Sequence, residues 1–158
     1  MTKQIPLTQG QVALVDDWRY EELSQWKWHA YWDPHTQSFY ATRNVPKSTV
    51  SMHRQIMNTP KGMICDHINH DTLDNQEHNL RNVTYSQNAL NARPKSINKL
   101  HQKNICIHQN GFRVRVTLKG NVVFSKYFGN LDDAIAARDA VLKEFHGEYA
   151  YQSDHRKE

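Results

Sequence analysis

The chain has 158 residues, enough for one ordinary domain or for two or three very small ones. Apolar residues make up 38% of it, and even with its six glycines counted this is below the roughly 45–50% of globular domains, so one deep core is not expected. The net charge is +4, and no apolar run is long enough to span a membrane. Cys65 and Cys106 stand alone, which excludes a disulfide framework and a four-cysteine zinc site and fits a reducing cytoplasm. We therefore expect a cytoplasmic protein without a membrane partner.

The first segment, residues 1–48, holds all four tryptophans. We expect these aromatic side chains to pack a small core, because such clusters are more often structural than base-stacking surfaces. Asp16 or Asp17 is well placed to cap a helix. The expected elements are a strand, this short helix and a β-hairpin around a turn-forming sequence, at residues 11–15, 16–23 and 28–45.

The second segment, residues 49–93, is expected to begin with a short helix capped by Ser51. A strand over residues 63–67 and an irregular polar stretch over residues 68–81 follow. Thr84 begins a capping box for a second helix, which must end by residue 93 because Pro94 disfavours helical geometry in the residue before it.

The third segment, residues 104–158, follows a basic linker over residues 94–103. Turn sequences separate three expected strands, and Asn130 is placed to cap a helix that Gly147 ends. These elements are expected at residues 104–108, 112–118, 122–128 and 131–145.

The middle strand of this segment alternates in polarity, so that one face is apolar and the other basic. The apolar face needs a cover, which the side of the helix carrying Ala134, Ala137, Ala140 and Val141 can supply. Residues 93–131 hold eight basic side chains and no acidic one, and such a field suits a polyanion. A solvated basic surface is the alternative. Nucleic acid is the favoured partner, because a sheet of this width can enter a major groove.

The densest polar group is the run DHINHDTLDNQEHNLRNVTYSQN, residues 66–88. Phosphodiester hydrolysis needs a base that works near neutral pH, a divalent cation held by hard oxygen atoms, and a residue that orients the base. Asp66 and His67 are neighbours on a strand, so their side chains leave on opposite sides unless the strand runs directly into a loop. Asn88 lies in the first turns of the following helix, where the positive N-terminal region favours phosphate.

This run resembles the HNH endonucleases of the phage and intron-encoded homing type, whose motif joins Asp-His, Leu-Asp-Asn, Asn-Leu-Arg and a later asparagine. The resemblance implies an α+β fold with a ββα-metal (His-Me finger) core, in which a two-stranded ribbon and a helix surround one divalent ion. It also implies roles for five residues: Asp66 and Asn88 as metal ligands, His67 as general base, Asn79 as the residue that orients His67, and Arg81 as a phosphate contact.

Many HNH members have histidine at the position of Asn88, whereas members of the homing branch commonly have asparagine there. An amide oxygen is a harder ligand than imidazole, so the expected cofactor is one Mg²⁺ or Mn²⁺ per active site rather than Zn²⁺. With one active site per chain, we expect a monomer that nicks double-stranded DNA, with no obligate protein partner. If phage-encoded, it would act in the cytoplasm of a bacterial host.

The flanking segments resemble parts of the same kind of protein. IPLTQGQVALVDDWRYEELSQWKW is similar to a segment that often precedes this core, and the stretch from about Asn104 to Tyr151 resembles the AP2-type DNA-binding domain, a three-stranded sheet backed by one helix. The AP2 resemblance implies DNA contacts from the sheet face, although the tryptophan that AP2 domains often place there is absent. The candidate contacts are Arg113, Arg115, Lys119 and Lys126.

Three alternatives remain open at this point. The chain is either the proposed nuclease, a sequence-specific DNA-binding regulator that keeps the fold without cleavage, or a restriction-type HNH nuclease. A zinc site built from His67, His70 and His78 lacks a fourth ligand, and we expect the latter two to be solvated loop residues. Cys65 is expected to be buried and unreactive, because nothing near it in sequence would activate its thiol.

Overall fold

The computed structural model describes residues 1–92, 100, 102–118 and 120–150. These residues form two compact units, Met1–Ser86 and Gln87–Glu158. Most of the expected basic linker, the predicted DNA contact Lys119 and the last eight residues of the chain lie outside the described residues. No helix among the described residues combines the length and apolar character needed to cross a bilayer.

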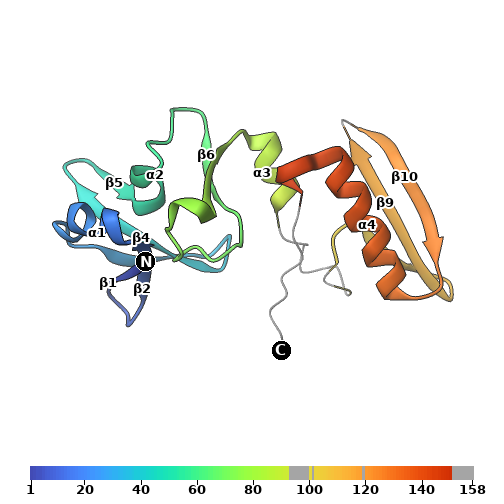
Figure 1. Cartoon of the computed structure of the whole chain (residues 1–158), viewed down its shortest axis with the longest axis horizontal. Helices are drawn as coiled ribbons and strands as arrows, with labels where there is room; N and C mark the ends of the chain where they lie inside the picture. Colours follow the sequence, from blue (N-terminus) through green and yellow to red (C-terminus); the bar gives the residue numbers. More distant parts are fainter. Residues whose placement is uncertain (93–99, 101, 119, 151–158) are drawn as a thin grey trace. The chain divides into compact units, whose positions relative to one another are not determined.

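The first unit is built from small antiparallel sheets and short helices (Figure 1). Strands β1 and β2 form one hairpin, β3, β4 and β5 form a three-stranded sheet, and β6 pairs with β7. In chain order these elements are β1 (Thr2–Pro6), β2 (Val12–Asp16), α1 (Asp17–Ser24), β3 (His29–Asp33), β4 (Ser38–Val45), β5 (Ser48–Ser51), α2 (Met52–Ile56), β6 (Ile64–His67), the 3₁₀ helix η1 (Glu77–Asn79) and β7 (Leu80–Val83). The expected hairpin, the strand before Asp16, the helices α1 and α2 and the strand ending at His67 are confirmed. Ser51 precedes α2 as expected, but its side chain makes no cap bond.

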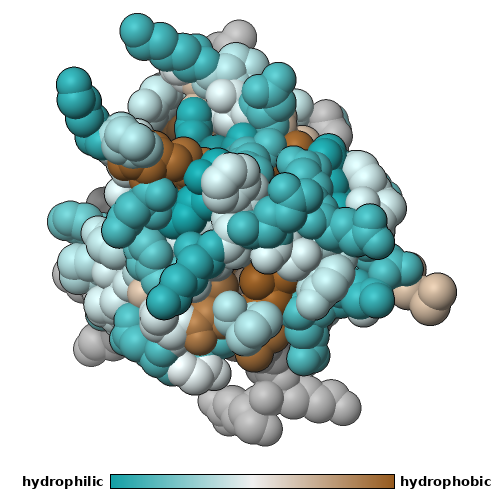
Figure 2. All heavy atoms as spheres, turned by 90° about the vertical axis from the view of Figure 1, so that its left-hand side faces the viewer, coloured by the Kyte–Doolittle hydropathy of each residue, from teal (hydrophilic) through white to brown (hydrophobic). Residues whose placement is uncertain are grey.

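One core joins the two segments that the sequence analysis treats separately. Its buried members come from both segments, so residues 1–48 do not form a module of their own. The physical reason is size, since neither segment has enough apolar side chains to bury a core by itself. The core residues are Ile5, Ala13, Val15, Leu23, Trp28, Ala41, Met52, Ile56, Cys65 and Leu80. The side shown in Figure 2 is accordingly mostly hydrophilic, with small hydrophobic areas.

Helix α3 (Tyr85–Asn91) begins at the end of the first unit and continues into the second. The division between the units falls after Ser86, whereas the sequence analysis placed the end of the nuclease core at residue 93. Most of α3, including Asn88, is therefore grouped with the C-terminal elements.

The second unit is a three-stranded antiparallel sheet with one long helix packed on it (Figure 1). Its elements are β8 (Ile105–His108), β9 (Gly111–Leu118), β10 (Asn121–Phe128), α4 (Leu131–His146) and the 3₁₀ helix η2 (Gly147–Tyr149). As predicted, Asn130 caps α4 by accepting a hydrogen bond from the Asp133 amide over 2.8 Å.

The apolar face of β9 packs under α4, as its alternation predicts. Val114 and Val116 are fully buried against Ala134, Val141 and Leu142 of the helix. Ala140, predicted to lie on the buried side of α4, is exposed. Arg138 is completely buried instead, with its guanidinium donating to the Lys103 carbonyl oxygen over 3.0 Å and to the Gln102 side-chain oxygen over 3.2 Å.

Candidate active site

The β6–β7 hairpin holds three of the predicted site residues in a defined register. Asp66 lies opposite Arg81, and His67 lies opposite Leu80. Because successive residues of a strand face opposite sides, Asp66 and His67 leave β6 on different faces. His67 is the last residue of β6, so the strand does end where the sequence analysis required it to end for both side chains to reach one phosphate.

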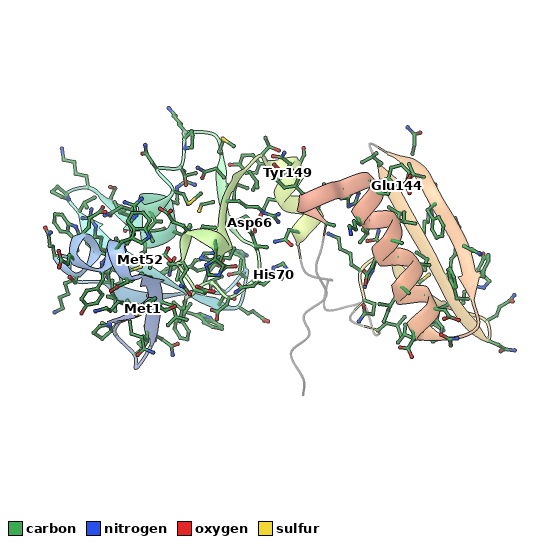
Figure 3. All side chains as sticks on the ribbon, in the orientation of Figure 1. Met1, Met52, Asp66, His70, Glu144 and Tyr149 are labelled. Atoms are coloured by element: carbon green, nitrogen blue, oxygen red, sulfur yellow. The ribbon has the colours of Figure 1, made fainter. Side chains whose placement is uncertain are left out.

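The carboxylate of Asp66 is held by the guanidinium of Arg81. Nε and an Nη nitrogen of Arg81 both donate to Oδ2 of Asp66, over 3.0 and 2.9 Å, and both side chains are largely shielded from water. Such a pair fixes the carboxylate in one place, since a charge-assisted bond to a guanidinium is directional. Arg81, predicted as a phosphate contact, therefore lies directly beside the predicted metal ligand (Figure 3 labels Asp66).

The imidazole of His67 is buried, with 5% of the residue exposed. Its Nε2 lies 3.5 Å from Oδ1 of Asn75, and its ring is 5.0 Å from the ring of His53 in an edge-to-face arrangement. Burial lowers the pKa of His67, against the weaker opposing effects of the Asn75 contact and nearby carboxylates. The imidazole is consequently neutral at neutral pH, which is the form that can accept a proton.

His53 is a site neighbour that the sequence analysis missed. It lies in α2, is 8% exposed, and contacts His67 and Tyr40 through its ring. Burial, together with smaller effects of His67 and Arg54, lowers the pKa of His53 to about 3. A signal could have been found in the spacing of Met52, His53 and Ile56, since all three lie on the buried side of α2.

Asn79 organises the loop between β6 and β7 rather than contacting the His67 ring in the bonds that the structure records. Its Oδ1 accepts from the Asn69 amide over 3.0 Å, and its Nδ2 donates to the Asp74 carbonyl oxygen over 2.8 Å. Asn79 is 3% exposed, so these bonds form in a shielded environment. Any effect of Asn79 on His67 is therefore transmitted through the loop backbone.

The residue beside the His67 ring is Asn75, the last residue of the Leu-Asp-Asn run. Its Nδ2 donates to the Leu73 carbonyl oxygen over 3.1 Å, which directs Oδ1 toward His67. Asn75 is 1% exposed, so its orientation is held by packing as well as by hydrogen bonds. Asn75 belongs to the motif that identified the site, but its position in the motif predicted no role for it.

Strand β2 holds the same loop from the other side. The Leu14 amide donates to the Leu73 carbonyl oxygen, and the Asn75 amide donates to the Leu14 carbonyl oxygen, each over 2.8 Å. Asp16, one of the two residues expected to cap α1, makes no side-chain cap bond; its Oδ2 instead accepts from the Glu77 amide over 2.8 Å. The N-terminal hairpin therefore supports the loop that presents Asn75 and Asn79.

Asn88 is placed on α3, in the part of that helix grouped with the second unit, and is half-buried. The structure thus brings Asp66, His67 and Asn79 together in one unit and describes Asn88 with the other. Among the described residues, no group of three or more His, Cys, Asp or Glu side chains could hold a metal ion. The predicted ligands are one carboxylate and one amide, hard oxygen donors that fit Mg²⁺ or Mn²⁺ completed by water and phosphate.

The other residues singled out in this segment are readily placed. His78 is exposed, as expected, whereas His70 is half-buried in the β6–β7 loop (Figure 3). Cys65 is buried, and burial raises the pKa of its thiol to about 11. A thiol that stays protonated at neutral pH is a poor nucleophile, in agreement with the expected structural role.

The exposed face of the second unit's sheet carries the predicted DNA contacts Arg113 and Arg115. Arg113 lies opposite Tyr127 and Arg115 opposite Ser125, and both of these β10 residues are exposed. Lys126 is not on this face, because it pairs with Val114, which is buried under α4. The structure therefore separates Lys126 from the two arginines. Its ammonium lies 5.6 Å from the centre of the Phe128 ring.

Comparison with known proteins identifies a family for the segment that contains the β6–β7 hairpin. Residues 58–90 match the family model described as HNH endonuclease. The segment includes β6, β7 and most of α3, and with them all the residues predicted to act in catalysis or metal binding. No curated protein and no solved structure matches the chain. The match supports an HNH nuclease core in this segment, while the resemblance of the C-terminal segment to AP2 domains stays a prediction.

Proposed function

We propose that this protein is a metal-dependent DNA endonuclease of the HNH homing type that nicks double-stranded DNA. The observation that best supports the proposal is the buried imidazole of His67, which lies at the end of β6 beside Asn75 and within the segment that matches HNH endonucleases. The chain order of β6, β7 and α3 is the order that a ββα-metal core requires.

The proton acceptor can be assigned to one ring atom. Asn75 presents Oδ1 to His67, and a carbonyl oxygen can only accept a hydrogen bond. The His67 tautomer that donates from Nε2 to this oxygen has its lone pair on Nδ1, and this is the tautomer that we propose for catalysis. In the proposed reaction Nδ1 takes a proton from a water molecule, and the oxygen of that water attacks the phosphorus. The bond between phosphorus and the 3′ oxygen breaks, and the 3′ oxygen takes a proton from solvent, which gives 5′-phosphate and 3′-hydroxyl ends.

Asp66 and Asn88 are the residues proposed to hold the cation. When bound, Mg²⁺ or Mn²⁺ would stabilise the charge that develops on the phosphate and on the leaving 3′ oxygen. Arg81 keeps the Asp66 carboxylate in a fixed position and brings a positive charge to the place where the phosphate is expected. Asn79 and β2 keep the loop ordered, so that Asn75 remains beside His67.

Binding to DNA is assigned to the exposed sheet face of the second unit. Arg113 and Arg115 project from β9 on the side away from α4. Nε of Arg113 donates to Ser125 over 3.2 Å, and its guanidinium carbon lies 5.6 Å from the centre of the Tyr127 ring. A basic surface with an aromatic neighbour can contact the phosphate backbone of a duplex.

A plasmid assay tests the proposal directly. The wild-type protein should convert supercoiled DNA to relaxed circles with Mg²⁺ or Mn²⁺ and lose this activity in EDTA. His67→Ala should abolish nicking and leave DNA affinity nearly intact, because His67 is not part of the sheet face proposed to supply most of the binding. His78→Ala, an exposed residue of the same segment, is the matched control and should nick normally. DNA binding without nicks in the wild-type protein would favour the regulator, and linear products from dilute protein would contradict nicking.

A further inference from the structure

Lys103 makes an unusual set of contacts at the end of helix α3. Its ammonium donates to the carbonyl oxygens of Ala89 and Leu90 over 2.8 Å each and to that of Ala92 over 3.1 Å. The first two belong to the last turn of α3, where carbonyl groups have no partner within the helix. A positive charge at this end also interacts favourably with the helix dipole.

Lys103 is itself held by the second unit. Its carbonyl oxygen accepts a hydrogen bond from the fully buried Arg138 of α4, and the same Arg138 nitrogen donates to Gln102. Arg138 also pairs with Asp139 over 2.6 Å. The contacts therefore run from the end of α3 through Lys103 to α4, which packs on the sheet.

The length of α3 makes these contacts important. The helix has seven residues, and isolated helices shorter than about 12 residues are marginal in water. Its order must therefore come from packing and from its ends. Burial lowers the pKa of Lys103 to about 8, so the side chain remains mostly charged at neutral pH.

We propose that Lys103 is a positioning residue. It clamps α3, the helix that carries Asn88, to α4 and the sheet of the second unit. The sheet and the helix then move as one body, although the residues between them in the chain were expected to form a loose linker. Binding of DNA by the sheet would thereby help to set the position of the Asn88 amide. This inference rests on the proposed function for the role of Asn88 but not for the clamp itself.

Hydrogen exchange on the metal-free full chain tests the clamp. Lys103→Met removes the ammonium and its three hydrogen bonds but keeps an unbranched side chain of similar bulk, so amides of α3 should exchange roughly tenfold faster, a modest effect for charge-assisted bonds. Lys103→Arg should restore most of the protection. Lys143→Met, an exposed lysine in the last turn of α4, should change nothing. Circular dichroism and exchange in β9 and α4 should remain as in the wild type, which separates loss of the clamp from unfolding.

The link to catalysis needs a second measurement. In Lys103→Met the Mn²⁺ concentration for half-maximal nicking should rise about tenfold, with DNA affinity in EDTA unchanged. Unchanged exchange in α3 overturns the clamp. Faster exchange with an unchanged Mn²⁺ requirement shows a clamp that does not position Asn88 and overturns the positioning role. If α3 exchanges faster in Lys103→Met but the wild-type protein does not nick DNA, the clamp is supported and the proposed nuclease function is refuted.

Discussion

Acid unfolding of the first unit should depend on one buried imidazole, that of His53. Its pKa is about 3 in the folded protein, because of burial, and about 6.5 in the unfolded chain. Below pH 6.5 the unfolded chain therefore binds a proton that the folded chain does not, and stability falls as the pH falls toward 3. Each pKa unit corresponds to about 1.4 kcal/mol, so this group should cost about 2 kcal/mol of unfolding free energy between pH 7 and 5, and about 3 kcal/mol between pH 7 and 4.

His53→Phe removes this titration and keeps an aromatic ring against His67 and Tyr40. Nδ1 of His53 has no hydrogen-bond partner among the described residues, so replacing that atom by carbon loses no hydrogen bond there. The variant should be at least about as stable as the wild type at pH 7 and should lose less stability in acid, by the amounts just given. His35→Phe, at an exposed turn position, should behave like the wild type.

Urea unfolding followed by tryptophan fluorescence is the appropriate assay. All four tryptophans lie between residues 18 and 32, so their emission reports on the first unit alone. All other titrating groups are common to the wild type and the variant, so the difference between the two proteins isolates the contribution of His53. If the two proteins lose stability in parallel between pH 7 and 4, then His53 is not held neutral by burial and the reasoning is refuted.

Three further predictions concern other parts of the chain. Arg115→Ala should weaken DNA binding and reduce the slope of log K against log salt, measured by fluorescence anisotropy, by about one. Lys126→Ala, on the other face of the sheet, should leave this slope unchanged, and equal effects of the two substitutions would refute the assignment of faces. Gly111→Ala should destabilise the second unit by about 1–3 kcal/mol, because the new methyl group meets a backbone oxygen of β10, while Gly129→Ala meets nothing and is the control in thermal melts followed by circular dichroism. Asn79→Ala should destabilise the first unit by about 2–4 kcal/mol and reduce nicking, because two shielded hydrogen bonds to the loop are lost; unchanged urea midpoints by tryptophan fluorescence would contradict this.

Local patterns predicted the elements of the second unit almost completely. The alternation of β9, the turn at Gly120 and the Asn130 cap each act between residues close in sequence, so spacing is enough to find them. Strand β1 was missed because Thr2–Pro6 has a single buried residue, Ile5, and no alternating pattern. Its structure comes from pairing with β2, which sequence reasoning about one strand does not include.

The candidate site was predicted in part for the same reason. Asp66, His67 and Asn79 lie on one short run, whose motif identified them. His53 and Leu14 are 14 and 53 positions from His67, and their contacts with the site region exist because the shared core brings α2 and β2 against the β6–β7 hairpin and its loop. No local pattern records such contacts.

By itself, the sequence determined which chemical groups are available: an adjacent acid and imidazole, amides at set spacings, and a strand with one basic face. Tertiary structure decided which of these groups meet. It placed Asn75 rather than Asn79 beside the His67 ring, paired Arg81 with Asp66, and turned Lys126 away from Arg115. The physical reason is that side-chain type and periodicity are set residue by residue, whereas partners are chosen by strand register and by a core built from distant segments.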